Sequence, residues 1–233
     1  MKKLISGLFF ATLIMPVFAA PVYRMPVKQA DSGWFNGTWY IGGRAGLSLM
    51  NWTNDYSTSA PTAAGEEGVT NDSMSEVVFG GAAFAGHIFD AHWRGEVEAG
   101  LIGKYEDEVD GVSFELAVPY VIANAYYDFN EGFYLGGGLG IALPKTRLSA
   151  PVYFIGNNSS ERVVSPMIGL MGGWTHRLDE RLVLDLRYRL AMLWGPEHTR
   201  DFISGVDTAV YGYTVDTGLI LDNSISLGLR YEF

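Results

Sequence analysis

Residues 182–194, LVLDLRYRLAMLW, decide the fold of this chain because their side chains alternate in character. Every second position is apolar, and the positions between them include Asp185, Arg187 and Arg189. Successive side chains of a β-strand point to opposite faces, whereas a helix would place Arg187 beside leucines. The stretch therefore predicts a strand with one apolar face and one charged face.

The same period of two recurs along the chain, with turn-forming stretches between the repeats. We distinguish eight such segments, at residues 38–50, 77–89, 93–106, 114–128, 133–144, 164–177, 182–194 and 223–233. Tight turns at residues 90–92, 130–132 and 179–181 alternate with longer links at residues 51–76, 107–113, 145–163 and 195–222. Short periplasmic turns and longer extracellular loops are typical of transmembrane β-barrels. The pattern predicts an all-β, eight-stranded antiparallel barrel.

The first residues predict export. Lys2 and Lys3 precede an apolar run at residues 4–15, and Pro16 is followed by the small residue Ala19. This is the layout of a secretory signal peptide that is cut after Ala19. A transmembrane helix is the alternative, but it needs about 20 apolar residues. We expect a signal peptide at residues 1–19, a periplasmic lead-in at 20–37 and an outer-membrane barrel at 38–233.

The composition excludes several classes of function. The chain has no cysteine, which removes disulfides, thiolate zinc sites and cysteine nucleophiles. Its formal net charge is −10, and loss of a signal peptide with two lysines and no acid makes it −12. Such a chain is a poor nucleic-acid binder, because phosphate contacts need clustered Lys and Arg. No later apolar run reaches helical span length, so a place in a membrane requires a barrel.

The end of the chain and two internal stretches carry a family resemblance. Residues 224–233, SISLGLRYEF, alternate up to a final Phe, and NAYYDF at 124–129 and LGGGLGI at 135–141 add to the pattern. The chain resembles the opacity-protein-like, OmpA-type outer-membrane β-barrels over residues 38–233. The resemblance implies a bacterial outer-membrane location, contact with lipid and lipopolysaccharide, and an assembly signal at Leu229, Tyr231 and Phe233 that the barrel-assembly machinery reads. It also leads us to expect no cell-wall-binding domain after Phe233.

The alternation assigns charged side chains to the interior of the barrel. An eight-stranded barrel is just wide enough inside for side chains to fill it. Buried charges must pair, so we expect a salt-bridge plug. The alternative is a gated ion path in which Arg and Glu set selectivity. The predicted lumen residues are Arg44, Arg94, Glu96, Glu98, Lys104, Asp185, Arg187, Arg189, Arg230 and Glu232.

Three features invite an enzymatic interpretation and do not sustain it. Glu96 and Glu98 have the spacing of paired catalytic carboxylates, but a filled lumen gives a substrate no route. His198 lies beside Glu197 in a predicted extracellular loop, without the motifs of lipid-modifying enzymes or proteases. The glycines at 136–140 open no helix, so they form no nucleotide loop, and we expect them to make room for bulky lumen side chains. We expect no catalytic residue, cofactor or metal.

The predicted function follows from this organisation. We expect a non-enzymatic outer-membrane surface protein whose barrel presents acidic extracellular loops for envelope integrity or for host and adhesion contacts. The loop ligand is not identified by the sequence. A small, porin-like ion channel is the first alternative, and a lipid-modifying outer-membrane enzyme is the second.

Overall fold

The computed structural model describes residues 37–58, 69–109, 112–129, 131–149, 158–195, 197–203 and 210–233. The signal-peptide and lead-in predictions, including cleavage after Ala19, lie outside these residues except for Gly37. The described strands are β1 (Thr38–Thr58), β2 (Val69–Ile88), β3 (Trp93–Val109), β4 (Val112–Asp128), β5 (Phe133–Ala142), β6 (Lys145–Ser149), β7 (Asn158–Arg162), β8 (Ser165–Arg177), β9 (Leu182–Trp194), β10 (Glu197–Ile203), β11 (Val210–Thr217) and β12 (Leu219–Glu232).

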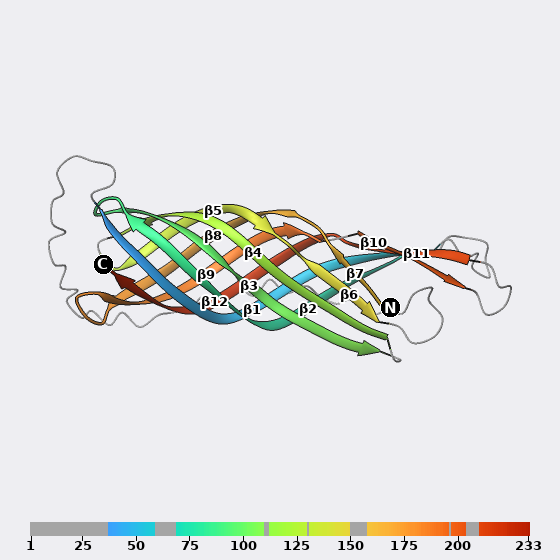
Figure 1. Ribbon diagram of the computed structural model, residues 1–233. Helices are drawn as coiled ribbons and strands as arrows, with labels where there is room; N and C mark the ends of the chain where they lie inside the picture. Colours follow the sequence, from blue (N-terminus) through green and yellow to red (C-terminus); the bar gives the residue numbers. More distant parts are fainter. Residues whose placement is uncertain are drawn as a thin grey trace, which may run out of the picture.

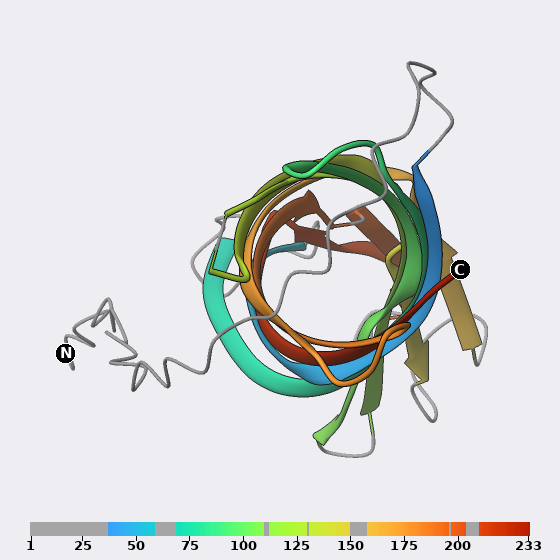
Figure 2. The same cartoon turned by 90° about the vertical axis from the view of Figure 1, so that its left-hand side faces the viewer.

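Eight of these strands form a closed antiparallel barrel. The order is β1-β12-β9-β8-β5-β4-β3-β2, and pairing of β1 with β2 closes the ring. Figure 2 shows the ring along the barrel axis, and Figure 1 shows its tilted strands from the side. The prediction of an eight-stranded antiparallel barrel is confirmed. Closure leaves no open edge along the paired wall, which a lipid-embedded sheet requires.

The predicted long links are partly strand. β1 and β2 stay paired from Thr38↔Ile88 to Ser57↔Val69, well past the predicted strand end at residue 50. β11 continues β12 along β1, and β10 pairs with β11. On the other side, β6 pairs with both β4 and β7. The segments predicted as loops thus extend the barrel wall outward.

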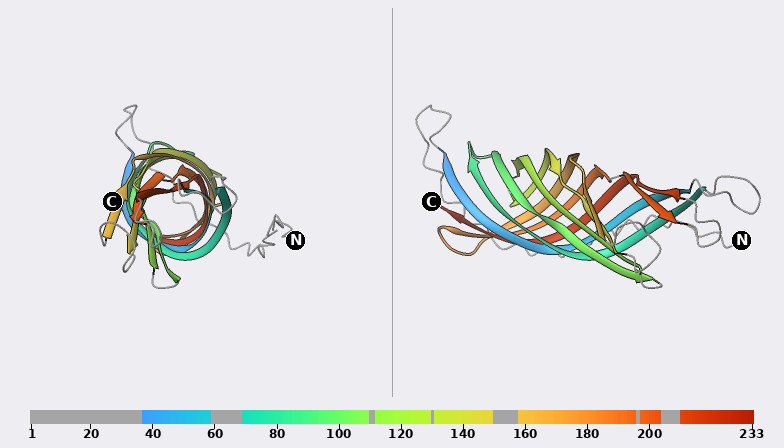
Figure 3. Two further views of the ribbon diagram at one scale, coloured as in Figure 1. Left: turned by 90° about the vertical axis from the view of Figure 1, so that its right-hand side faces the viewer. Right: turned by 45° about the vertical axis from the view of Figure 1, so that its right-hand side comes forward.

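The extensions divide into two sheets, which we call the first arm (β2-β1-β11-β10) and the second arm (β3-β4-β6-β7). The β2–β3 ladder ends at Gly81↔Leu101, and the β8–β9 ladder ends at Met167↔Leu193. Beyond these pairs, the described strands of one arm form no ladder with those of the other. Figure 3 shows the first arm reaching farther from the barrel than the β3–β4 hairpin.

The exterior of the barrel is apolar. Large side chains such as Phe79, Leu135 and Leu139 are 60–69% exposed, which suits lipid rather than water. At the end with the tight turns, an aromatic girdle faces outward, formed by Trp39, Phe89, Trp93, Phe129, Phe133, Tyr231 and Phe233. An apolar outside around a charged inside is the architecture of a bacterial outer-membrane barrel. Within the described part of the chain, no helix has the length and hydropathy of a membrane span.

Two aromatic residues of β1 point inward rather than joining the girdle. Tyr40 is fully buried, and Trp52 is 3% exposed and packs edge-on against Tyr105. Both occupy even positions of β1, on the same face as the lumen residue Arg44. Trp194 faces outward at the outer end of β9. Among the described side chains, fewer aromatic rings therefore face outward at the outer end than at the end with the tight turns.

Candidate functional site in the barrel lumen

Glu98 on β3 is the centre of the lumen network. Its carboxylate lies 2.7 and 3.0 Å from the Nη atoms of Arg187 and 3.3 Å from an Nη of Arg189, both on β9. Arg44 of β1 approaches the same carboxylate at 3.3 Å, and the Tyr120 hydroxyl of β4 donates a hydrogen bond to it. Glu98 is fully buried. Strands on opposite sides of the barrel are thereby tied to one carboxylate.

Arg44 links this centre to a second carboxylate. Its Nη2 atom lies 2.8 Å from Glu96 Oε1 and 3.9 Å from Asp185 Oδ2. The hydroxyls of Tyr40 and Tyr126 donate to Glu96, at 3.3 and 3.1 Å. Each carboxylate is thus bonded to cations and phenols, which offsets part of the desolvation cost of burying it.

The periplasmic end of the lumen contains two further ion-pair groups. The Arg94 Nε atom donates to both carboxylate oxygens of Asp128 at 3.1 Å, and its guanidinium lies over the rings of Tyr126 and Tyr134. Glu232 pairs with Arg177 at 2.6 Å and Arg230 at 2.9 Å. The Tyr134 hydroxyl donates to Asp185 at 2.7 Å. The Glu232–Arg177 pair links β12 to β8, and the other contacts link β3 to β4 and β5 to β9.

One lumen residue was missed by the sequence analysis. Asp222 was counted among the acids of the last predicted loop, but it lies in β12, fully buried, 2.9 Å from Arg189 Nη2. Ser48 donates a hydrogen bond to the same carboxylate. The alternation does extend upstream of residue 223 through Ile220 and Asp222, so a longer final strand was the signal that could have identified it.

The prediction for Lys104 is wrong. It was predicted to face the lumen, but its side chain is 48% exposed and pairs with Glu106 and Glu115. The β3–β4 register shifts between Leu101 and Lys104, and Ile102 and Gly103 are both buried. Such a bulge inserts a residue and exchanges the two faces of the strand beyond it.

The other nine predicted lumen charges lie inside the barrel and, with Asp222, balance in sign. Among the described residues, the buried charged side chains are five arginines and five carboxylates: Arg44, Arg94, Arg187, Arg189, Arg230, Glu96, Glu98, Asp185, Asp222 and Glu232. A balanced, paired set is the composition of a plug, whereas a selective pore presents an excess of one sign.

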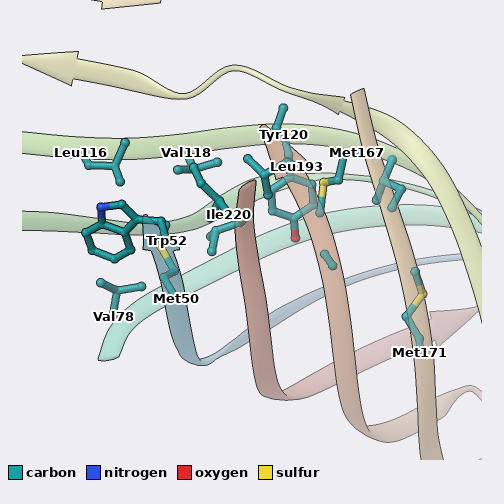
Figure 4. Packing of buried hydrophobic residues seen from close by; sticks show 14 of the residues in the cluster. Met50, Trp52, Val78, Leu116, Val118, Tyr120, Met167, Met171, Leu193 and Ile220 are labelled. Carbon is teal, nitrogen blue, oxygen red and sulfur yellow. The ribbon is translucent and has the colours of Figure 1, made fainter. Parts of the chain in front are cut away.

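An apolar cluster fills the outer part of the lumen, above the ion pairs. Met50 and Trp52 of β1 meet Leu116 and Val118 of β4 and Ile220 of β12, each at most 3% exposed (Figure 4). Met167 and Leu193 continue the cluster across β8 and β9. The interior therefore has a charged section and an apolar section in series.

The glycines of β5 make room inside the barrel for side chains of the adjacent strand. A Cβ added at Gly136 would strike the Tyr126 ring, and one at Gly138 would strike the Asn124 side chain. Both neighbours are on β4. The outward-facing Gly137 has only ordinary contacts at its Cβ position, 3.7 Å and beyond.

The remaining candidate residues do not assemble into a reaction centre. His92 bonds to the Asp128 carbonyl, and His176 stacks on Trp174. The backbone of His198 pairs with Val215, and its side chain lies outside the described part of the chain. No group of three or more potential metal ligands occurs in the described residues. Leu229, Tyr231 and Phe233 face outward at 45, 39 and 67% exposure, and their role as an assembly signal stays a prediction.

Comparison with known proteins adds a set of similar solved structures. No family model and no curated protein matches the chain, so membership of the opacity-protein-like family stays a prediction. Neisserial surface protein A is 16% identical, with 84% of this chain and 97% of that one covered and a TM-score of 0.47.

Two further barrels have similar scores. Yersinia pestis Ail, the attachment invasion locus protein, solved with the heparin analogue sucrose octasulfate, is 15% identical over 82% of this chain and 99% of its own, with a TM-score of 0.44. The Escherichia coli outer-membrane protease OmpT is 9% identical over 83% and 97%, also at 0.44. These scores are too low to carry an argument about function, and the fold rests on the strand pairing.

Proposed function

We propose that this chain is a non-enzymatic surface protein of the bacterial outer membrane, a closed barrel that holds two arms outside the lipid. The filled lumen is the observation that carries the proposal. Five arginines and five carboxylates pair in one section, and a dry apolar cluster closes the other. Charges paired with one another in one section and apolar side chains packed in the other disfavour the channel alternative.

The lumen chemistry also supports a role outside catalysis. Glu96 and Glu98, the pair with the spacing of catalytic carboxylates, are each buried and already bonded to arginine and tyrosine groups. A general acid or base must reach a substrate proton within hydrogen-bond distance. Groups that are fully engaged inside a packed barrel do not meet that requirement.

The first arm is the part that we assign to contacts outside the membrane. Asp55, Asp216 and Glu197 lie in register on three adjacent strands, and all three are exposed. Like charges directly opposite one another destabilise a pair of strands. This row of three carboxylates therefore lowers the stability of the arm. A carboxylate row suits contact with a positively charged surface, whether of the envelope or of another cell.

Shortening the arms separately tests this assignment. One variant replaces residues 54–72 by a tight turn and removes 197–217, and the matched control shortens the second arm at residues 106–115 and 145–163. Both retain the paired barrel. We expect the intact protein and the control variant to bind equally well, both to cationic vesicles and to cells. The first-arm variant should lose most of this binding. Equal binding by all three, with the barrel folded, would contradict the role of the first arm.

A further inference from the structure

A small cavity lies where the ion pairs of the lumen meet the apolar cluster. Its volume is about 30 Å³. Its lining includes three arginines, Arg44, Arg187 and Arg189, and four residues with hydroxyl groups: Ser48, Tyr120, Ser224 and Ser226. No carboxylate belongs to the described lining, because Glu98 and Asp222 contact these arginines from elsewhere. The charged residues of the lining are therefore all arginines, and their counter-charges lie outside it.

Two of the lining arginines have N–H groups without a hydrogen-bond acceptor among the described residues. These are the Nε atoms of Arg44 and Arg187, and both side chains are 3% exposed. A buried donor that lacks an acceptor destabilises the folded state. The cavity is the adjoining space in which an acceptor can be placed.

The volume restricts what that acceptor can be. A cavity of about 30 Å³ holds at least one water molecule or one small ion. A halide is a spherical acceptor of the right size, and it matches donors that converge from several strands.

We propose that this cavity is a binding site for one small inorganic anion of chloride size, held by Arg44 and Arg187 with help from Ser224 and Ser226. The anion supplies the acceptor that the two Nε groups lack. The lumen would then bind a halide without conducting it, because the apolar cluster closes the outer side.

Bromide is the direct probe of this site, because it scatters anomalously and replaces chloride. In crystals of the refolded protein grown with sodium bromide, we expect an anomalous peak within hydrogen-bond distance of Arg44 and Arg187. Ordered water at that position, with no anomalous signal, would overturn the proposal.

Solution stability gives an independent test at lower salt. A ligand that binds only the folded state raises the urea midpoint as its concentration rises. We expect sodium bromide to stabilise the protein relative to sodium gluconate of equal ionic strength, since gluconate is too large to enter. The double variant Ser224→Ala/Ser226→Ala should need roughly tenfold more bromide for the same gain, which corresponds to a loss of about 1.4 kcal/mol of binding free energy.

The matched control is Ser75→Ala. Ser75 is exposed on the outside of the barrel, where it donates to Asn51. It should respond to bromide as the unmodified protein does. The same bromide response in all three proteins, or none in any of them, would show that the cavity does not bind the anion.

Discussion

At the scale of single residues, Glu98 carries the largest share of the account. Three arginines and one tyrosine hydroxyl converge on a carboxylate that has no contact with solvent. Replacing a buried ion pair by apolar groups can be neutral, whereas removing one partner leaves an uncompensated charge. A substitution that removes one partner of the ion pair and leaves the other buried is therefore expected to destabilise the protein.

Glu98→Gln should lower the free energy of unfolding by about 3–5 kcal/mol, because Arg44, Arg187 and Arg189 lose their common counter-charge. Urea unfolding of the refolded protein in lipid vesicles measures the change. Glu106→Gln is the control, because Glu106 is 65% exposed and pairs with the exposed Lys104. That change should stay within about 0.5 kcal/mol. Equal, small effects would show that the network adds little stability.

Residue-level prediction from the sequence worked where the strand period was unbroken. Arg44, Arg187 and Arg230 occupy the interior face that period two assigned to them. It failed at Lys104 because a bulge is a local change of register that alternation cannot reveal. Asp222 was misplaced because the last strand was predicted to start at residue 223, four residues after its start at Leu219.

At the scale of elements, β5 shows why this wall needs glycine. Tyr126 and Asn124 of β4 project across the inner face of Gly136 and Gly138, so a side chain there would displace them. Outward positions of the same strand carry Leu135, Leu139 and Ile141 toward lipid. One strand thus combines three inward-facing glycines, at 136, 138 and 140, with large outward-facing side chains.

Gly138→Leu should reduce the yield of folded barrel severely, because the new side chain meets Asn124 and the carbonyl of Ala123. Gly137→Leu is the matched control on the next residue, and it should fold normally because its Cβ position is open toward lipid. The measurement is the fraction that migrates as the compact form on a gel without heating. Similar yields for the two variants would refute the packing role.

The outer ends of the strands were the elements least accessible to sequence reasoning. The segments at 51–76 and 195–222 are polar, and the sequence analysis therefore predicted them as loops. In the structure the backbone of β1 pairs there with β2 and with β11. Strands that lie in water do not need an apolar face of their own. Their backbone hydrogen bonds continue the ladders of the barrel, and this pairing holds them in place. Periodicity therefore ends at the lipid boundary while the sheet continues.

At the scale of the whole molecule, the barrel is closed to lipid on its wall and filled inside. The charged section and the apolar section lie in series, so opening one leaves the other in place. This arrangement suits a rigid support for the two arms, which divide where the β2–β3 and β8–β9 ladders end. Any exchange with the outside would have to pass both sections.

The two sections can be tested separately by substitution. Trp52→Ala with Leu116→Ala thins the apolar section, and Glu98→Gln disturbs the charged one. Because the sections lie in series, we expect neither variant alone to conduct and their combination to show brief, low conductance. A stable pore in either variant alone would show that one section forms the whole barrier.

Single-channel recording of the purified, unmodified protein in planar bilayers is the most direct test of the closed lumen. Insertion should be verified independently by heat-modifiable migration of the same preparation. The account predicts inserted protein without a stable conducting state across the voltage range. A large, long-lived open conductance in every insertion would contradict the plug and make the channel the function.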